Sequence, residues 1–399
     1  MTFNIKQVQL RNLLLEPTRN GLTKPKAIRG RGVPMIAMGE IFANNRIFSF
    51  PMERVPVTDK ELSSSSIYEG DLLFARQSLV LEGAGKCCIV KEVNEPTVFE
   101  SHLIRVRLDN SKALPDYIYY YFNSYQGKEN IKTIVEQVAA AGIRGSDLVN
   151  LYIPIPPITV QQQILQVLMN IDDKIAVNTT INENLELQAQ AIFKSWFLDF
   201  EPFGGVMPED WRTGSLSEIC GYSKDKVNIE DLTLDTYYST ENMQPNRQGA
   251  VQATALPTIK QTIACKKGDV LISNIRPYFK KIIYCFVDCG CSTDVLCFVP
   301  NKSEYSAFLY CALYSDKFFD YMVAGSKGTK MPRGDKQQIM MYPICIPSTE
   351  YVEQFSKIVA PMLETVYTNR LEANDLAILR DTLLPKLMKG EIDVSEVKI

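Results

Sequence analysis

The segment IPIPPITVQQQILQVLMNIDDKIAVNTTINENLELQAQAIFKSWFLDFEP, residues 153–202, decides the architecture of this chain. Thr159 followed by Gln162 matches a capping box, in which two side chains satisfy backbone N–H groups of a first helical turn. Beyond it, mostly apolar residues recur with the a/d spacing of a coiled coil. The a positions are Ile164, Ile171, Asn178, Leu185 and Ile192, and the d positions are Leu168, Ile175, Asn182, Ala189 and Trp196. The segment therefore predicts a helix of about 40 residues, roughly 60 Å long, that pairs with another helix.

The same pattern returns near the end of the chain, at an offset of about 191 residues. Its a positions are Phe355, Met362, Asn369, Leu376 and Leu383, and its d positions are Val359, Val366, Ala373, Arg380 and Leu387. We expect helices over 160–199 and 351–388 to pair antiparallel, which places Asn182 opposite Asn369 and Trp196 opposite Phe355. Ile171 then faces Arg380, the one poor layer. Asparagines within a seam fix register at a cost in stability; alternatively, they mark a solvated gap or a break in the helix.

The two long segments that precede these helices, one before each helix, repeat as well. Gly70–Leu73 returns as Gly268–Leu271, and Tyr117–Tyr120 corresponds to Phe308–Cys311. Runs such as DLLFAR and HLIRVRL are typical of strands, and DYIYYYFNSYQ is typical of a short buried helix. The predicted fold is α+β, with two similar mixed α/β domains separated by two long helices that form an antiparallel coiled coil. The expected boundaries are 1–150, 151–201, 202–345 and 346–399.

Composition and charge narrow the classes of function. Hydrophobic residues make up 46% and charged residues 22% of the chain, as in soluble globular proteins. No apolar run reaches the roughly 20 residues of a membrane helix, and no secretion signal is visible at the N-terminus. We therefore expect a cytoplasmic protein without a membrane partner. The net charge of −3 hides mildly basic long segments and acidic helical ones, so only the long segments could attract phosphate.

A search for catalytic and cofactor motifs finds no complete one. Val80 and Cys87 break the similarity of GAGKCC, residues 83–88, to a phosphate-binding loop. The single histidine, His102, is best interpreted as structural. Ten cysteines without a CxxC pair favour reduced, mostly buried thiols over zinc ligands, and whether the group at 285–297 binds anything stays open. The sequence predicts no catalytic residue, metal or cofactor, and favours recognition of a long ligand such as duplex DNA at two sites.

With these features in view, essentially the whole chain resembles the specificity subunits of Type I restriction–modification systems. The resemblance is strongest in residues 153–202, above all FKSWFLDFEP at 193–202, and in the weaker copy at 344–390, where LLPKLMKGEI replaces the aromatic segment. GDLLFAR at 70–76 and PEDWRTGSLSEI at 208–219 add to it. The resemblance implies two target recognition domains, each reading one half of a bipartite, asymmetric DNA target. It also implies that the two helices set the spacer between the half-sites.

The resemblance further implies the partners. The helices would recruit two adenine-methylating modification subunits, and restriction subunits would join through these. S-adenosylmethionine, ATP and Mg²⁺ would belong to the partners, and this subunit would be non-catalytic. The assembled complex would be an adenine-specific DNA methyltransferase and an ATP-dependent site-specific endonuclease.

Three alternatives remain at this point: a recognition subunit of a related bipartite-site restriction or methylation system, a self-contained DNA methyltransferase or nuclease, and a scaffold that uses the coiled coil only for assembly. The missing catalytic and cofactor motifs disfavour the enzyme. The mildly basic long segments disfavour the scaffold.

Basic side chains, mostly in Gly/Pro-rich loops, are the candidates for DNA contact. The main loops are KPKAIRGRG at 24–32 and GSKGTKMPRGDK at 325–336. Flexible basic loops suit phosphate contact or groove entry, although such charge runs are often merely solvated. The candidates are Lys24, Lys26, Arg29, Arg31, Arg76, Arg144, Arg276, Lys327, Lys330, Arg333 and Lys336.

The aromatic end of the first long helix raises a separate question. Trp196 belongs to the helix–helix seam, but Phe197 and Phe200 lie off it. Large apolar side chains at such positions need another cover. We expect either the start of the second globular segment or a modification subunit to provide that cover.

Overall fold

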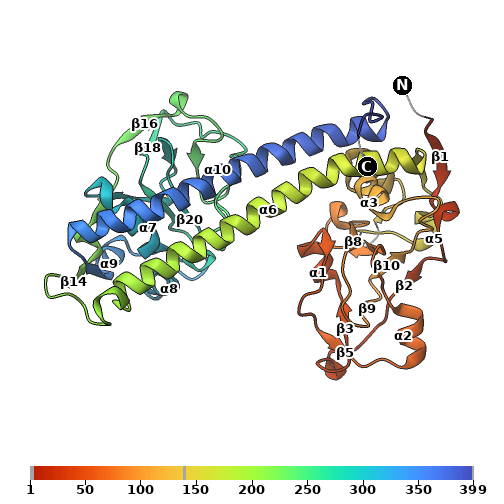
Figure 1. Cartoon of the computed structure of the whole chain (residues 1–399), viewed down its shortest axis with the longest axis horizontal. Coiled ribbons are helices and arrows are strands. Elements are labelled where there is room, and N and C mark those ends of the chain that lie inside the picture. The colour runs from red at the N-terminus through yellow and green to blue at the C-terminus, as the bar shows by residue number, and fades with distance from the viewer. Residues whose placement is uncertain (1–3, 138–140, 398–399) are drawn as a thin grey trace. The chain divides into compact units, whose positions relative to one another are not determined.

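The computed structural model describes residues 4–137 and 141–397 of the chain. Two compact units are distinguished: one comprises Met1–Ile175 with Asn374–Ile399, and the other comprises Ala176–Ala373. Two helices of 40 residues each, α6 (Ile158–Phe197) and α10 (Thr349–Met388), run from one unit into the other (Figure 1). Each unit therefore consists of a globular part and its own half of the helix pair.

The long helices lie within two residues of their expected limits, which is the usual uncertainty of helix ends. Helix α6 ends where the backbone changes hand. Phe200 adopts a left-handed conformation with φ of 53°, and Gly204 and Gly205 follow with φ of 75° and 80°. A residue with left-handed backbone angles cannot continue a right-handed helix, so α6 ends before Phe200. The two glycines adopt such angles without strain and let the chain turn toward the second globular part.

The two helices pair antiparallel in the predicted register. In the first unit, Ile164 and Leu387 are both buried in one hydrophobic cluster. In the second unit, the Nδ2 of Asn369 donates to the Oδ1 of Asn182 at 2.9 Å, and the rings of Trp196 and Phe355 lie 6.2 Å apart. The asparagines therefore mark a hydrogen-bonded layer within two continuous helices, which excludes the interpretation as a helix break.

The globular part of the first unit is built on a five-stranded sheet in the order β2-β10-β6-β8-β4. The neighbouring pairs are antiparallel except β4 with β8, which is parallel. The strands of this sheet are β2 (Arg19–Asn20), β4 (Arg46–Ile47), β6 (Leu72–Ala75), β8 (Cys87–Val90) and β10 (Leu103–Val106). Smaller sheets contain β1 (Lys6–Gln9) with β13 (Tyr152–Ile155), β3 (Val33–Ile36) with β5 (Arg54–Val55) and β9 (Val98–Phe99), and β7 (Gln77–Ser78) with β11 (Glu136–Gln137) and β12 (Ala141–Gly142). The helices are α1 (Met38–Ala43), α2 (Asp59–Ser65), α3 (Pro115–Asn123), α4 (Tyr125–Lys132) and α5 (Gly145–Leu148).

The globular part of the second unit contains two four-stranded sheets, in the orders β15-β22-β19-β20 and β16-β18-β21-β17. The first consists of β15 (Cys220–Tyr222), β19 (Val270–Ser273), β20 (Ile282–Tyr284) and β22 (Val295–Pro300). The second consists of β16 (Lys226–Asn228), β17 (Tyr237–Tyr238), β18 (Gln261–Cys265) and β21 (Cys289–Cys291). A separate pair joins β14 (Arg212–Ser215) to β23 (Pro343–Ile346), and the helices are α7 (Ser306–Tyr314), α8 (Asp316–Ala324) and α9 (Lys336–Met340).

The internal repeat is visible in these elements. Antiparallel β1–β13 corresponds to β14–β23, and the buried aromatic helix α3 corresponds to α7. Ser124 and Ser315 cap the helices that follow, accepting hydrogen bonds from the backbone N–H of Gly127 and Phe318 at 3.1 and 3.2 Å. The predicted α+β class and two-fold repeat are confirmed. Within the described residues, every helix is too short or too polar to span a membrane.

Candidate nucleic-acid interface

The structure divides the four basic residues of the 24–32 loop into two groups. Lys24 is only 10% exposed, and its Nζ lies 2.8 Å from the Oε1 of Glu61, a hydrogen bond that lowers the pKa of Glu61 to about 2. Arg29 lies 2.7 Å from Glu53 and also donates to the carbonyl of Lys24. Lys26 and Arg31 are exposed and have no ion-pair or side-chain hydrogen-bond partner among the described residues. Lys26 and Arg31 are therefore the two side chains of this loop that are free to meet a phosphate.

The 325–336 loop of the second unit is more open. Lys327, Lys330, Arg333 and Lys336 are all exposed. Lys327 pairs with Asp335 at 2.5 Å, Arg333 pairs with Asp294 at 3.1 Å, and the ammonium of Lys336 lies 5.9 Å from the centre of the Tyr222 ring. Exposed pairs of this kind are weak, so a phosphate can replace the partner.

The remaining arginine candidates are Arg276 in the second unit and Arg76 and Arg144 in the first. The backbone N–H of Arg276, a residue with a left-handed φ of 50°, donates to the carbonyl of Pro332, and its side chain reaches the carbonyl of Lys330 at 3.5 Å. In the first unit, the carbonyl of half-buried Arg76 accepts from the N–H of Ile143, next to Arg144. Arg144 is 66% exposed and pairs with Glu136. Arg76 therefore lies close to Arg144 in the first unit and Arg276 lies against the 325–336 loop in the second, while the 24–32 loop is tied to α2 and to the residue before β5.

The aromatic end of α6 is covered from within the second unit. The Phe197 side chain is 1% exposed, its ring centre lies 4.8 Å from that of Phe308, and it stacks on Trp211 at 5.6 Å. Phe200 is half-buried with its ring 6.3 Å from Trp211. Of the two covers expected from the sequence, the start of the second globular part is the one that the structure contains.

Two partly buried carboxylates were missed by the sequence analysis. Asp172, on α6, binds Arg380 of α10 at 2.8 Å and Arg46 of β4 at 2.7 Å. The guanidinium of Arg380, the polar member of the Ile171 layer, is therefore neutralised by the residue that follows Ile171 on α6. The sequence contained a signal for this ion pair: Arg380 occupies a seam position, and the residue after its expected partner Ile171 is the acidic Asp172.

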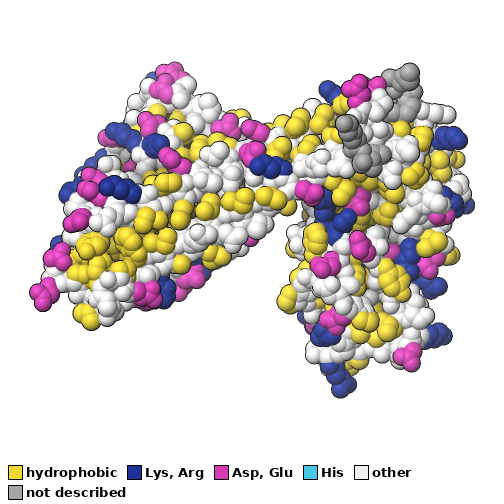
Figure 2. Space-filling view, in the orientation of Figure 1, with side chains coloured by type: hydrophobic (Ala, Val, Ile, Leu, Met, Phe, Trp, Pro, Cys, Tyr) yellow, Lys and Arg dark blue, Asp and Glu magenta, His cyan; other side chains and the backbone are white. Residues whose placement is uncertain are grey.

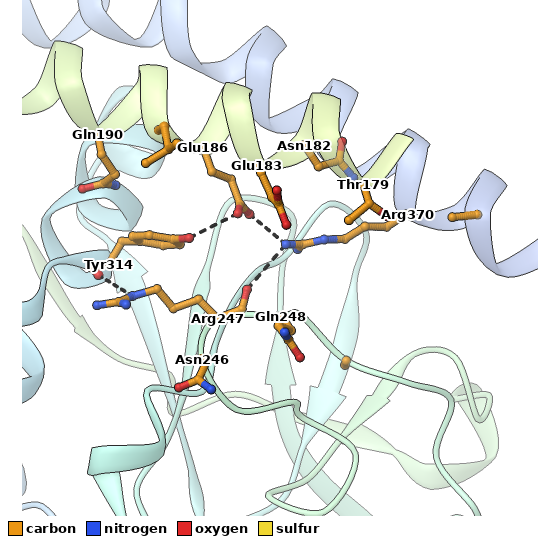
Figure 3. Close-up of a pocket in the computed structure, with 13 residues that line it drawn as sticks. Thr179, Asn182, Glu183, Glu186, Gln190, Asn246, Arg247, Gln248, Tyr314 and Arg370 are labelled. Carbon is orange, nitrogen blue, oxygen red and sulfur yellow. Dashed lines mark hydrogen bonds and ion pairs between the residues drawn. The ribbon is translucent and has the colours of Figure 1, made fainter. Parts of the chain in front are cut away.

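The second carboxylate, Glu186, lies in an open cavity of about 630 Å³ between the helix pair and a loop of the second globular part (Figure 3). It accepts from Arg370 of α10 at 2.7 Å and from the hydroxyl of Tyr314 on α7 at 3.2 Å. Burial raises the pKa of Glu186, and the positive charge of Arg370 opposes that shift. The carboxylates Asp172 and Glu186 thus each connect both long helices to a globular part.

The cysteines of the second unit form part of its core. Cys265, Cys285, Cys289, Cys291 and Cys297 are buried in one hydrophobic cluster, and the sulfur atoms of Cys285 and Cys289 lie 3.6 Å apart. In the part of the chain that the structure describes, no group of three or more His, Cys, Asp or Glu side chains is arranged to hold a metal ion. His102 lies outside this cluster and contacts the side-chain oxygen of Gln77 at 3.1 Å.

The helix pair also carries exposed apolar side chains, which gather over the helices of the second unit in Figure 2. Val177, Ile181, Leu187 and Leu371 are 51%, 41%, 69% and 49% exposed. Apolar residues gathered on a helix surface are typical of protein–protein interfaces.

Comparison with known proteins identifies the class of protein that this architecture defines. Residues 17–187 and 208–377 each match the family described as Type I restriction modification DNA specificity domain. The two matches cover more than half of the chain and each contains one globular part with most of one long helix. The chain therefore belongs to this family.

Among individual proteins, the chain is 25% identical to the Type I restriction enzyme MjaIX specificity subunit of Methanocaldococcus jannaschii, over 94% of this chain and 90% of that protein. It is 23% identical to the HindI specificity subunit of Haemophilus influenzae, over 83% and 88%. Its fold is similar to the crystal structure of a Type I restriction–modification S subunit from M. genitalium, with a TM-score of 0.63, 17% identity and coverage of 97% and 96%.

Proposed function

We propose that this chain is the DNA sequence-recognition subunit of a Type I restriction–modification complex and carries no catalytic activity itself. The observation that carries the proposal is the repeated family match, which assigns a DNA specificity domain to each globular part. Residues 1–150 and 202–345 act as target recognition domains. Each reads one half of a bipartite duplex target, and the helical segments 151–201 and 346–399 set the spacer between the half-sites.

The helix pair recruits two modification subunits, and restriction subunits join through these. The exposed Val177, Ile181, Leu187 and Leu371 support this assignment, because they offer an apolar surface on the helices themselves. S-adenosylmethionine, ATP and Mg²⁺ are ligands of the partner subunits. The complex acts on chromosomal and incoming DNA in the cytoplasm.

Contacts to DNA come from the basic side chains of the 24–32 and 325–336 loops and from Arg76, Arg144 and Arg276. Lys26, Arg31 and Lys330 carry the most weight, because they are exposed and have no ion-pair partner among the described residues. Arg144, Arg276, Lys327 and Arg333 follow, since the partners of their side chains are a backbone oxygen or a carboxylate that phosphate can replace. Half-buried Arg76 and Lys336, which lies over the Tyr222 ring, complete the set. Lys24 and Arg29 hold the loop in place and contribute to binding indirectly.

Methylation mapping tests this function directly. The chain is expressed with the modification subunits of its own system in a host without adenine methylation, and the genome is read by single-molecule sequencing. We expect methyladenine in one bipartite motif, and its complete absence when either the chain or the modification subunits are omitted. Methylation by the chain alone would instead identify a self-contained methyltransferase, and methylation by the partners without the chain would contradict the recognition role.

A further inference from the structure

One carboxylate joins four elements of the first unit. The Oδ2 of Asp172 on α6 accepts from Arg46 of β4 at 2.7 Å and from the hydroxyl of Tyr120 on α3 at 2.5 Å, while its Oδ1 accepts from Arg380 of α10 at 2.8 Å. The guanidinium of Arg46 also lies 5.6 Å from the centre of the Tyr120 ring. Asp172 is only 12% exposed. Burial raises the pKa of Tyr120, whose hydroxyl therefore stays protonated and donates its hydrogen to the carboxylate.

The second unit contains a network of the same chemical composition (Figure 3). Glu186 on α6 is 14% exposed and holds Arg370 of α10 and Tyr314 of α7. Arg247, from the loop between β17 and β18, lies 4.8 Å above the Tyr314 ring and donates to the Tyr314 carbonyl at 2.8 Å. Each network therefore contains one carboxylate of α6, one arginine of α10, one tyrosine of the aromatic helix and one arginine of the globular part. The arginine of the globular part binds the α6 carboxylate in the first unit, whereas Arg247 reaches the network through Tyr314 and pairs with Asp316.

The internal repeat does not produce this match. At the repeat offset of about 191 residues, Asp172 corresponds to Leu363, and Arg370 corresponds to Thr179. Both carboxylates come from the same helix, α6, although the two globular parts otherwise use equivalent elements. Residues at positions that are not related by the repeat thus form similar networks where each globular part meets the helix pair. This similarity suggests that the two networks have the same role.

The physical chemistry of the networks indicates what that task is. A buried ion pair adds little net stability compared with apolar packing, and Ile164 and Leu387 already provide such packing in the first unit. Charge-assisted hydrogen bonds are directional, however, and Asp172 is held by three donors and Glu186 by two, which restricts the orientation of the neighbouring elements. Apolar contacts alone would allow the globular part to rock on the helices.

We infer that Asp172 and Glu186 are positioning residues, which fix the orientation of each recognition domain on its own helix pair and so restrict the spacer length that the subunit accepts. This inference rests on the proposed function. A change of one base pair in the spacer moves a half-site by about 3.4 Å and rotates it by about 35°. A domain locked in orientation cannot follow such a change, whereas a domain that rocks can follow part of it.

The test compares Asp172→Asn and Glu186→Gln with matched controls on the same helix, Asp173→Asn and Glu183→Gln, whose carboxylates are exposed. Each variant is assembled with the modification subunits, and its affinity is measured for duplexes that carry the mapped half-sites. The spacers are of natural length and one base pair shorter or longer. We expect the wild-type complex and both controls to prefer the natural spacer by about ten-fold or more. Asp172→Asn and Glu186→Gln should reduce this ratio to about three-fold or less.

The ratio separates positioning from stability, because a partly unfolded complex binds all three duplexes less well and keeps the ratio. If Asp172→Asn does not fold, Tyr120→Phe removes a single hydrogen bond of the network and should lower the ratio in the same direction. A ratio that stays at the wild-type value in the folded variants overturns the inference. A wild-type complex that fails to distinguish the spacers contradicts the proposed function instead.

Discussion

At the residue scale, two neighbouring lysines of one loop have opposite roles. Lys24 is held by Glu61, a residue 37 positions away, whereas Lys26 projects into solvent. A lysine bound to a carboxylate carries no free charge to release counterions from DNA, so only the unpaired side chains should contribute to the salt dependence of binding.

We therefore predict that Lys26→Ala with Arg31→Ala weakens DNA binding and lowers the magnitude of the log–log salt slope by about 2, since each phosphate contact contributes about 0.9. The measurement is a titration of the mapped target by the assembled complex at several salt concentrations. Lys24→Ala is the matched control and should leave the slope unchanged. Equal slopes for the double variant and the wild type would leave 24–32 as a solvated loop.

At the scale of single elements, the end of α6 is stabilised by burial rather than by helix propensity. Phe197 is enclosed by Phe308, Trp211 and Phe355. Both tryptophans of the chain, Trp196 and Trp211, lie in the second unit, so tryptophan fluorescence reports on the unfolding of that unit alone.

Phe197→Ala should lower the free energy of unfolding of the second unit by about 3–5 kcal/mol, because the cavity left behind closes only in part. Denaturant unfolding followed by tryptophan fluorescence measures this loss. The adjacent Leu198 is 45% exposed, and Leu198→Ala should change the free energy by less than about 0.5 kcal/mol. A similar loss for both variants would show that the aromatic cluster does not support the helix end.

The asparagine layer of the helix pair lends itself to a second measurement. Asn182→Ala leaves the amide of Asn369 without its 2.9 Å partner and should destabilise the second unit by about 1–3 kcal/mol. Replacing both asparagines by leucine removes the buried amide of Asn182 together with the half-buried amide of Asn369 and should restore at least that stability, at the expense of register. Tryptophan fluorescence again follows the transition. If the double leucine variant is less stable than Asn182→Ala, the hydrogen-bonded asparagines stabilise the helix pair in addition to selecting its register.

At the scale of the whole molecule, each unit has a hydrophobic core of its own. Cys87 is buried in the core of the first unit, and Cys220 and Cys311 are buried in that of the second. Burial raises the pKa of all three thiols, so they react only when their own unit opens. The thiols are therefore internal reporters of the two cores.

We predict that Phe197→Ala accelerates the labelling of Cys220 and Cys311 by a thiol reagent in mild denaturant and leaves the labelling of Cys87 at the wild-type rate. Peptide mass spectrometry of the labelled full-length chain provides the rates. Asp172→Ala should have the reverse effect, because its contacts all lie in the first unit. Equal acceleration at all three thiols would indicate a single cooperative transition.

Sequence alone determined the two long helices and their antiparallel register, because heptad spacing is a local periodicity that can be read along one helix at a time. It also determined the internal repeat and the family, through similar residues and motifs in the two halves of the chain. Only the tertiary structure decided which charges are free. Lys24 and Lys26 differ through Glu61, and the charge of Arg380 is neutralised by Asp172. Phe197 likewise owes its cover to Trp211 and Phe308. These partners come from distant segments without a fixed spacing, and an ion pair depends on distances of a few ångströms that only the folded chain sets.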